Sequence, residues 1–503
     1  MNQSTETPPA HPLRRSVVRR LWMVLGGLAI ALSFLDTRAW PLAWFGLVPL
    51  FALAPHAHRP RSAFFDGWIV GLVANGTACA WLVETIDRFG GFPIAVALAF
   101  YAALIAFTAV PFGIVAALLR RAGPGAPVLL APALWVSSEF LFPNFFPWRI
   151  AYSQREVPWL IQIGDITGAY GLSFVMAWFA SAVSRARRHP RTLLPPLLAT
   201  VALCLYGAVR IDTIRAEIAA APAATIGVVQ GNLSLVEKRQ GDLFRANVER
   251  YRRLSRDLDP APDLLVWPET VVGWAIPRRA VHLRRLDPFP DAPAPLLFGA
   301  ISHESVGGST RWYNSAFLRD RRGRVAGRYD KLVLMPFGEF LPFASTFPVL
   351  KQLSPNTGDF TPGDGPAVLE VDPDLRVGTL VCYDDMLAGH VRHSGSLGAT
   401  LLLTLANDAW FGDSSALDLH ESLGLWRAIE NRRYLVRATN TGLTSVIDPL
   451  GAVTLTLPTW TEVAALVPVR LLATPTPYQM LGDAFAWAVV ALALVLLLKS
   501  NWR

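Results

Sequence analysis

Long apolar stretches recur along this chain and constrain its fold more than any other feature. A helix needs roughly 20 mainly apolar residues to cross a membrane, and eight stretches of the sequence approach that length. They are approximately residues 20–36, 41–56, 63–84, 92–119, 125–143, 160–184, 192–211 and 480–498. The composition agrees, because 52% of the 503 residues are hydrophobic and only 17% are charged. The chain is therefore predicted to be an integral membrane protein with several spans.

Positive charges are distributed unevenly over the loops between these stretches. If the N-terminus is cytoplasmic, fourteen Lys and Arg residues lie on the cytoplasmic side and four lie in the short opposite loops. The fourteen are Arg14, Arg15, Arg19, Arg20, Arg59, Arg61, Arg120, Arg121, Arg185, Arg187, Arg188, Arg191, Lys499 and Arg503. The four are Arg38, Arg88, Arg149 and Arg155. This bias predicts that both termini are cytoplasmic. Many of these arginines flank apolar stretches, and no nucleic-acid motif is present, so the net charge of +8 does not indicate a nucleic-acid partner.

The region from residue 213 to 475 has a different pattern and is predicted to be a soluble α/β domain outside the cytoplasm. Short apolar runs rich in β-branched residues occur at 224–229, 264–267, 296–299, 377–381 and 400–404. Helical patterns at 243–258 and 417–437 lie between some of them. Alternating strands and helices predict a layered α/β fold. The predicted domains are residues 1–212 with about seven membrane helices, 213–475, and a last membrane helix with a cytoplasmic tail in 476–503.

Three polar residues of this domain follow or lie close to apolar runs and have complementary chemistry. Cys382 ends the run 377–381, Glu269 follows 264–268, and Lys331 lies in 328–332. Each has an ordinary alternative, as a core thiol, a helix cap and an exposed lysine respectively. Together they suit acyl transfer through a thioester, since a thiolate is a strong nucleophile. Glu269 would act as the base, with a pKa raised by partial burial. Lys331 and a backbone N–H near Cys382 would stabilise the oxyanion.

Other residues support narrower predictions. Cys79 and Cys204 lie in apolar stretches and are predicted to be buried thiols. The sequence contains no Cys-x-x-Cys pair, so it indicates neither a zinc site nor a disulfide framework. We predict no metal or other cofactor. Glu139 is costly in lipid and is predicted to face the bundle interior, most simply in a helix-packing hydrogen bond. Residues 337–350 are rich in Phe and Pro, and they form either a buried connection or an arm that dips into the lipid interface.

The motifs around the three polar residues resemble a known signature. Val-Trp-Pro-Glu at 266–269, Tyr-Asp-Lys at 329–331 and Val-Cys-Tyr-Asp at 381–384 are similar to the Glu-Lys-Cys signature of the nitrilase superfamily. The runs 229–232, 335–339 and 407–414, with membrane segments 146–154 and 165–171, narrow the resemblance to bacterial apolipoprotein N-acyltransferases. It covers nearly the whole chain. It implies a nitrilase-like αββα sandwich in the periplasm, carried by an eight-helix domain in the bacterial inner membrane.

The resemblance also implies a two-step reaction without a cofactor. Cys382 would take an acyl chain from a phospholipid, phosphatidylethanolamine in most members, and form a thioester and a lysophospholipid. The α-amine of a diacylglyceryl-cysteine at the N-terminus of an apolipoprotein would then accept the chain as an amide. Glu269 matches the general base and Lys331 the oxyanion stabiliser. Three further residues match supporting positions: Glu339, which orients Lys331 or the amine, and Tyr383 and Trp410, which line the pocket.

The sequence departs from the family pattern at two positions. Asp384 stands where the family usually has glutamate, and Arg239 stands where it often has tryptophan. A cation at residue 239 would favour a phosphate headgroup. Two alternatives remain open at this point. The same three residues could hydrolyse an amide in a membrane-anchored nitrilase-like amidase, because the motifs do not distinguish water from an amine as acceptor. The chain could also be a non-catalytic lipid-binding membrane protein.

Overall fold

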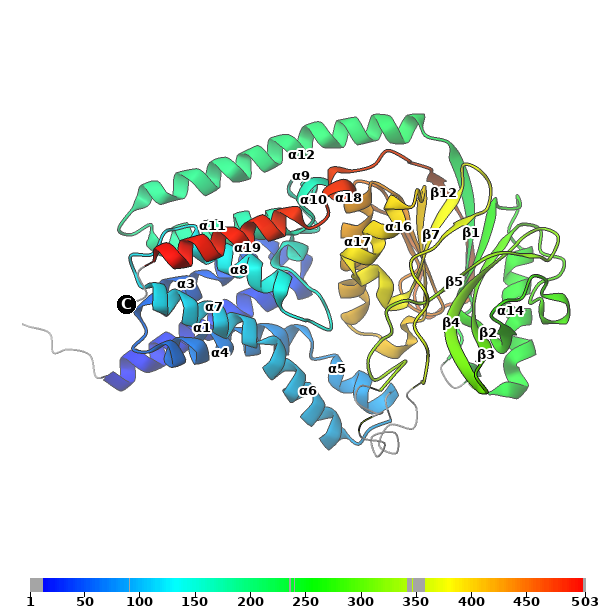
Figure 1. Ribbon diagram of the computed structural model, residues 1–503, viewed down its shortest axis with the longest axis horizontal. Coiled ribbons are helices and arrows are strands. Elements are labelled where there is room, and N and C mark those ends of the chain that lie inside the picture. The colour runs from blue at the N-terminus through cyan, green and yellow to red at the C-terminus, as the bar shows by residue number, and fades with distance from the viewer. Residues whose placement is uncertain are drawn as a thin grey trace, which may run out of the picture.

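A bundle of apolar helices and a β-sandwich lie end to end in the computed structural model (Figure 1). The structure describes residues 12–89, 91–234, 237–238, 240–341, 346 and 358–500. The bundle is formed by the chain before residue 222 together with the chain after residue 476, and the sandwich is formed by the segment between them. This arrangement confirms the predicted fold class, a multi-span helical domain joined to an α/β domain.

The bundle contains long helices interrupted by short ones. They are α1 (Pro12–Leu35), α2 (Ala43–Gly46), α3 (Val48–Leu53), α4 (Pro60–Ala78), α5 (Leu82–Glu84), α6 (Ile94–Thr108), α7 (Val110–Ala122), α8 (Leu130–Leu141), α9 (Pro158–Ile161), α10 (Gly164–Thr167), α11 (Tyr170–Arg185), α12 (Leu194–Ala220), α18 (Pro477–Leu481) and α19 (Ala484–Lys499). The 3-10 helices η4 (Ile150–Gln154) and η5 (Pro190–Leu193) connect some of them.

Fewer of these helices reach membrane-spanning length than the eight predicted stretches suggest. Within the described ranges, four segments are long and apolar enough: Val17–Leu35, Thr37–His56, Ile94–Ala122 and Pro190–Ala220. A fifth is the pair Pro60–Ala78 and Leu82–Arg88, which is bent by 65°. Glycines interrupt two of the others, since Gly168 and Gly482 adopt positive φ values of 59° and 58°, a conformation that ends a helix. The helices that follow these glycines, α11 and α19, have 16 residues each.

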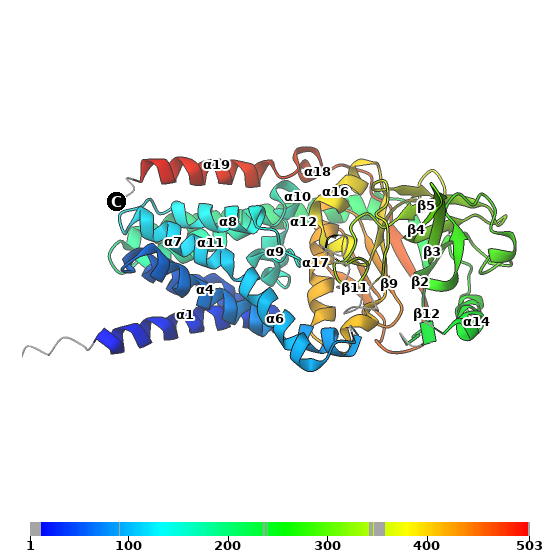
Figure 2. The ribbon, with the colours of Figure 1, turned by 60° about the horizontal axis from the view of Figure 1, so that its bottom comes forward.

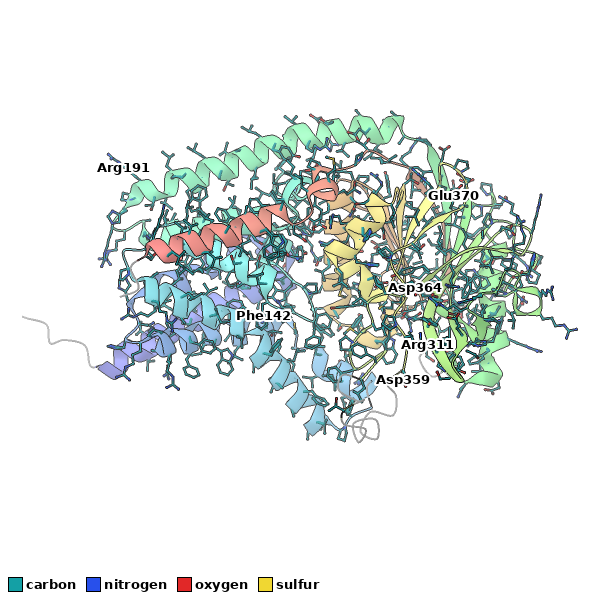
Figure 3. All side chains as sticks on the ribbon, viewed as in Figure 1. Phe142, Arg191, Arg311, Asp359, Asp364 and Glu370 are labelled. Carbon is teal, nitrogen blue, oxygen red and sulfur yellow. The ribbon has the colours of Figure 1, made fainter. Side chains whose placement is uncertain are left out.

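The first and the last described helices meet at one end of the bundle. Figure 1 shows the start of α1 and the end of α19 at the end farthest from the sandwich. Arg191, in η5 before α12, lies at that end too (Figure 3). From there α12 runs along the whole bundle and delivers the chain to the first strand of the sandwich.

Two six-stranded sheets form the sandwich. The first has the order β12-β1-β2-β3-β4-β5 and the second β11-β10-β9-β8-β7-β6. The strands are β1 (Ala223–Gln230), β2 (Leu264–Pro277), β3 (Leu296–Val306), β4 (Ser309–Arg319), β5 (Val325–Asp330), β6 (Val368–Glu370), β7 (Arg376–Val381), β8 (Leu401–Ala406), β9 (Leu435–Thr439), β10 (Ser445–Ile447), β11 (Val453–Thr456) and β12 (Val463–Arg470). The central pairs β1–β2–β3 and β7–β8–β9 are parallel, and the outer pairs are antiparallel.

Helices cover the outer face of each sheet, which gives the predicted αββα layers. Helix α14 (Phe244–Arg256) covers the first sheet, and α16 (Ala388–Ser396) and α17 (Ala416–Asn431) lie between the second sheet and the bundle (Figure 2). On β7, Val377 and Val381 pack between the sheets, whereas Leu380 packs into the core shared with the bundle. Both faces of the strand are therefore buried, which explains its uninterrupted apolar run.

Two predicted element boundaries are wrong. Strand β2 does not stop before Glu269 but continues to Pro277, with a register irregularity between Trp267 and Val272. The helix predicted over 417–437 ends at Asn431, because Arg432 adopts a left-handed φ of 49° and β9 then begins at Leu435.

A buried ion pair joins the bundle to the sandwich. The Asp165 carboxylate, in α10, accepts hydrogen bonds from Arg432 Nη2 at 2.8 Å and from Arg210 Nε at 2.7 Å. Tyr206 donates its hydroxyl to the same carboxylate at 2.6 Å. Asp165 has no exposed surface. The left-handed turn at Arg432 therefore directs the Arg432 guanidinium to a buried carboxylate of the bundle.

Three smaller predictions have different outcomes. The packing role of Glu139 is confirmed, since its carboxylate accepts hydrogen bonds from its own helix and from the main-chain N–H of Ile150, both at 2.9 Å. Cys79 and Cys204 are half-buried free thiols, so the prediction that they are buried is wrong. Most of the predicted arm over 337–350 lies outside the described residues, so neither alternative for it is decided.

Candidate active site

Cys382 lies at the C-terminal end of β7, where the chain turns into the 3-10 helix η8 (Cys382–Met386). Its φ of 49° is in the left-handed region that non-glycine residues rarely adopt. Such backbone strain persists only where the surroundings enforce it, and it is concentrated at functional sites. The thiol is half-buried. Burial and the nearby Glu269 carboxylate raise the pKa of Cys382, while the Lys331 ammonium acts in the opposite direction.

Asp384 holds this turn in place. Its Oδ2 accepts hydrogen bonds from the main-chain N–H of Val381 at 3.0 Å and from the Tyr329 hydroxyl at 2.8 Å. Its Oδ1 accepts a longer one from the N–H of Val333 at 3.4 Å. Asp384 has no exposed surface, and burial raises its pKa. Asp384, the departure from the family's glutamate, therefore ties the Cys382 turn to the segment that carries Lys331.

Glu269 lies within β2 at the register irregularity, beside Thr270, whose φ is 46°. The neighbouring strand β3 passes very close, since a Cβ on Gly299 would lie 2.7 Å from the Cα of Glu269 and 2.5 Å from the main-chain nitrogen of Thr270. Glycine at position 299 is thus required by this close approach. Glu269 is 8% exposed, and burial raises its pKa although Lys331 opposes the shift.

Asn314 bridges two carboxylates of the site. Its Nδ2 donates to Glu269 Oε1 and to Glu339 Oε1, both at 2.7 Å. Glu339 Oε2 accepts from Lys331 Nζ at 2.7 Å and from the main-chain N–H of Met335 at 2.8 Å. Lys331 is 1% exposed. Burial alone would lower the pKa of Lys331, but Glu339, with Cys382 and Glu269, raises it above its usual range. The structure thus brings the predicted triad and Glu339 together around an asparagine that the sequence did not indicate.

A second lysine that was not predicted reaches the same cluster. Lys238 donates from Nζ to the main-chain carbonyl of Glu269 at 2.8 Å. Burial lowers the pKa of Lys238 to about 8, although Glu269 and Cys382 act in the opposite direction. Arg239, the predicted headgroup-binding residue next to it, lies outside the described residues.

Tyr383 and Trp410 lie on two short helices that follow the neighbouring strands β7 and β8. Tyr383 follows Cys382 in η8 and donates its hydroxyl to the main-chain carbonyl of Phe145, in the bundle. Trp410 is half-buried in the 3-10 helix η9 (Asp408–Phe411). The Tyr383 contact places the Cys382 turn directly against the membrane domain.

A buried charge cluster lies next to the Cys382 turn. Asp385 Oδ1 is 2.7 Å from His420 Nε2, and Asp385 also accepts a hydrogen bond from Arg437. Asp408 lies 3.7 Å from the same guanidinium. His420 and Arg437 lower the pKa of Asp385 even though burial opposes them. The cluster joins η8 and η9 to α17 and β9 beside Cys382.

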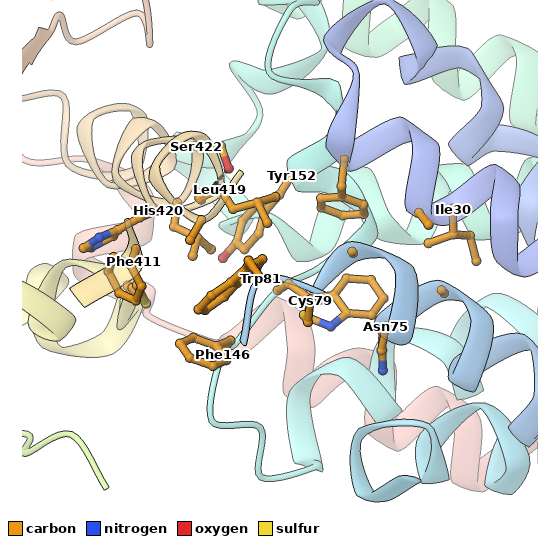
Figure 4. A pocket seen from close by; sticks show the side chains of 18 residues that line it. Ile30, Asn75, Cys79, Trp81, Phe146, Tyr152, Phe411, Leu419, His420 and Ser422 are labelled. Atoms are coloured by element: carbon orange, nitrogen blue, oxygen red, sulfur yellow. Dashed lines mark hydrogen bonds between the residues drawn. The ribbon is translucent and has the colours of Figure 1, made fainter. Parts of the chain in front are cut away.

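An apolar cavity opens at the junction of the two domains. It lies between α1, α4 and α17 (Figure 4). Its walls include Ile30, Trp81, Phe146, Met386, Phe411 and His420. Met386 belongs to the same short helix as Cys382, and Phe411 follows Trp410, so the cavity adjoins the elements that carry the site.

Comparison with known proteins gives matches to both domains and to the full length. The apolipoprotein N-acyltransferase N-terminal domain model matches residues 26–182, and the carbon-nitrogen hydrolase model matches residues 225–473. The chain is 36% identical over 499 residues to the apolipoprotein N-acyltransferase of Geobacter metallireducens, with 94% of each chain covered. It is 32% identical over 506 residues to that of Gloeobacter violaceus, with 97% of this chain and 95% of the relative covered.

Solved structures resemble about half of the chain. Nit3 of Saccharomyces cerevisiae, a nitrilase-superfamily member, is 17% identical, with a TM-score of 0.38 over 49% of this chain and 90% of Nit3. An amidase from Nesterenkonia is 21% identical, with a TM-score of 0.34 over 52% of this chain and 93% of the amidase.

Proposed function

The chain belongs to the apolipoprotein N-acyltransferase family, and on that premise we propose that Cys382 is the nucleophile of its reaction, with Glu269 as base and Lys331 as oxyanion stabiliser. The protein is an apolipoprotein N-acyltransferase of lipoprotein maturation. The amidase and lipid-binding alternatives are set aside, because the relatives match over the membrane domain as well. The observation that carries the assignment is the Asn314 bridge, which gathers Glu269, Glu339 and Lys331 beside a strained Cys382.

In the first step, Glu269 accepts the proton of the Cys382 thiol, and the thiolate attacks the carbonyl carbon of an acyl ester. The oxyanion that forms is stabilised by the Lys331 ammonium. When it collapses, the carbon–oxygen bond of the ester breaks and Glu269 returns the proton to the departing oxygen. The products are a thioester on Cys382 and a lysophospholipid.

In the second step, the α-amine of the diacylglyceryl-cysteine attacks the thioester carbonyl. A carbon–nitrogen bond forms, and the carbon–sulfur bond then breaks. Glu269 takes one proton from the nitrogen and passes it to the Cys382 sulfur, which restores the thiol. The same three residues therefore serve both half-reactions, with Glu339 and Asn314 holding Lys331 and Glu269 in position.

We propose a phospholipid as the acyl donor, with phosphatidylethanolamine as the first candidate. The apolar cavity beside η8 supports this choice, because a hydrocarbon chain needs an apolar site next to the nucleophile. Tyr383 and Trp410 are proposed to line the path of the substrates, and Arg239 to meet the phosphate. Asp384 is proposed to act through the turn that it holds.

We further propose that residues 213–475 are the catalytic domain, with 1–212 and 476–503 as the membrane part. The proposed location is the bacterial inner membrane, with both termini cytoplasmic and the catalytic domain periplasmic. Arg191 supports this orientation because it lies at the bundle end farthest from the sandwich (Figure 3). Cysteines introduced at exposed Arg311 and Lys499 test it in intact cells permeable only at the outer membrane. An impermeant thiol reagent should label residue 311 and not 499, and the reverse pattern would refute the orientation.

The nucleophile is tested by trapping the first step. The purified protein is incubated with phosphatidylethanolamine of known chain length and analysed by mass spectrometry of the intact chain and of its peptides. We expect one acyl adduct on Cys382 that hydroxylamine removes, followed by transfer to a diacylglyceryl-cysteinyl peptide. An adduct elsewhere, or transfer by a Cys382→Ala variant, would contradict the assignment.

A further inference from the structure

The position of Lys238 is fixed by a built turn. Ser234 and Glu237 form a reciprocal capping pair, with the Ser234 N–H donating to Glu237 Oε2 at 2.8 Å and the Glu237 N–H donating to Ser234 Oγ at 3.1 Å. Helix α14 holds this turn from outside, since Asn247 donates to the Glu237 carbonyl at 3.1 Å and Arg250 pairs with its carboxylate at 3.3 Å. Lys238 directly follows this anchored residue, so its side chain has a defined direction into the site.

The two lysines of the site are in different electrostatic situations. Lys331 is neutralised by the Glu339 carboxylate at 2.7 Å. Lys238 instead meets a neutral acceptor, the main-chain carbonyl of Glu269, at 2.8 Å. The charged and titratable groups that act on it are the Glu269 carboxylate on β2 and the Cys382 sulfur on η8. On its own turn, Glu237 is already paired with Arg250 of α14.

The ammonium group of Lys238 would have more hydrogen-bond donors than it has acceptors nearby. A protonated lysine has three N–H donors, and within the described part of the chain the Nζ of Lys238 has one hydrogen-bond partner and no carboxylate within ion-pair distance. The neutral amine satisfies the same carbonyl and leaves a lone pair free. The lowered pKa of Lys238, about 8, agrees with this difference.

We propose that Lys238 is the proton acceptor that makes the acceptor amine nucleophilic in the second half-reaction. This inference rests on the proposed function of Cys382 and Glu269. The α-amine of a peptide has an ordinary pKa of about 8, so near neutral pH it arrives largely as an ammonium that cannot attack. One proton passes from this ammonium to Lys238. The amine attacks the thioester, and Glu269 transfers a second proton to the sulfur. The amide keeps the third hydrogen, and Lys238 releases its proton to water.

The test separates the two half-reactions. Wild type, Lys238→Met and Lys238→Arg are loaded with acyl chain from phosphatidylethanolamine, and the thioester on Cys382 is quantified. A diacylglyceryl-cysteinyl peptide is then added, and the single-turnover rate of transfer is followed from pH 6.5 to 9.5. Lys499→Met, a change on the last turn of α19, is the matched control.

We expect both Lys238 variants to slow transfer by about 100-fold at pH 7 and to recover most of that loss at pH 9.5, where the peptide amine is neutral without help. Arginine is informative because it keeps the positive charge but is not deprotonated in proteins. Since the loaded thioester reports a folded site in each sample, a slow transfer is not explained by misfolding.

Three outcomes would overturn the inference. Transfer by Lys238→Arg within threefold of wild type would show that a fixed cation suffices. A loss that persists unchanged at pH 9.5 would assign Lys238 a positioning role only. Absence of any thioester on the wild-type Cys382 would overturn the proposed function and this inference together, whereas a normal thioester with unaffected transfer overturns this inference alone.

Discussion

Replacing Glu339 by glutamine tests the central ion pair of the site. The carboxylate accepts three hydrogen bonds, from Lys331 and Met335 on one oxygen and from Asn314 on the other. Glutamine offers a single oxygen, so at least one donor must face its NH2 group, which costs about 1–3 kcal/mol. Removing one partner of a buried ion pair costs about 3–5 kcal/mol, and Lys331 is only 1% exposed. We therefore expect about 3–5 kcal/mol in total, since these contributions overlap.

This cost should be visible in both stability and rate. For a domain of this size, 3–5 kcal/mol corresponds to a Tm lower by roughly 6–20 °C, measured by thermal unfolding in detergent. Thioester formation should slow by about 10²–10⁴-fold, because the same energy no longer holds Lys331 where the oxyanion forms.

The pH dependence should change as well. Glu339 raises the pKa of Lys331, so the stability that this pair contributes is complete below the unfolded-state pKa of lysine, about 10.4, and is lost only as pH rises through the folded value. Without Glu339 the pKa of Lys331 falls, and the variant should lose activity on the alkaline side at a lower pH than wild type.

A matched control and a clear refutation complete this test. Glu249→Gln removes an exposed carboxylate of α14 that pairs with Arg252 and Arg256 at 3.1 Å each, and it should change neither Tm nor rate measurably. If Glu339→Gln melts within 2 °C of wild type and forms the thioester within threefold of its rate, the ion pair does not support the site as we infer.

Two further substitutions and one pH profile test other parts of the proposed site and of the interdomain contact. Asp384→Glu adds a methylene to a contact with no exposed surface, so we expect a loss of about 1–3 kcal/mol and slower thioester formation, and an unchanged Tm would contradict the tight fit. Asp165→Asn leaves the buried Arg432 without its counter-charge and should lower stability by about 3–5 kcal/mol in a thermal melt, whereas a neutral effect would show that the interdomain pair is dispensable. Burial raises the pKa of Glu269, and the form of Glu269 that acts as base is the carboxylate. The rate of thioester formation should therefore fall as the pH drops through a pKa above the ordinary value for glutamate, about 4.3. A pH–rate profile without such a fall at acidic pH would argue against Glu269 as the base.

The triad was predictable because each of its members follows a local pattern. Cys382 comes directly after an apolar run that is buried on both faces of its strand, and the acidic turn behind it is visible in the sequence. Asn314 carries no such signal, since it lies inside β4 and acquires its role only when β4 pairs with its neighbours. Lys238 is an intermediate case. The Ser-x-x-Glu pattern at 234–237 is a helix-start signal that predicts the turn before Lys238. The direction of the Lys238 side chain toward Glu269, however, depends on the contacts of this turn with α14.

The wrong boundaries have a common cause in tertiary contacts. The helix over 417–437 was extended too far because nothing in the local sequence marks Arg432 as left-handed. Its conformation is stabilised by Asp165, which lies in the other domain and 267 residues away. Likewise, β2 continues past Glu269 because Gly299 on β3 leaves room for the irregular strand. Neither partner lies close enough in sequence to influence a local pattern.

The membrane bundle is part of the active-site architecture as well as its anchor. Leu380, Met386 and Trp426 of the sandwich share one continuous hydrophobic core with Tyr152 and Met176 of the bundle. The residue next to the nucleophile reaches further, since the Tyr383 hydroxyl bonds to a bundle carbonyl.

The turn that carries Cys382 is thus held from two sides. Asp384 fixes it to the Lys331 segment of the sandwich, and Tyr383 fixes it to the bundle. A residue with a strained φ keeps that conformation only when its surroundings are rigid, so loss of either support should let the turn relax. The apolar cavity lies at the same junction between bundle and sandwich. The interdomain contact that positions the Cys382 sulfur therefore also borders the cavity that we propose for a hydrocarbon chain. A catalytic domain separated from its bundle would therefore lose the geometry of its nucleophile together with one wall of its lipid site.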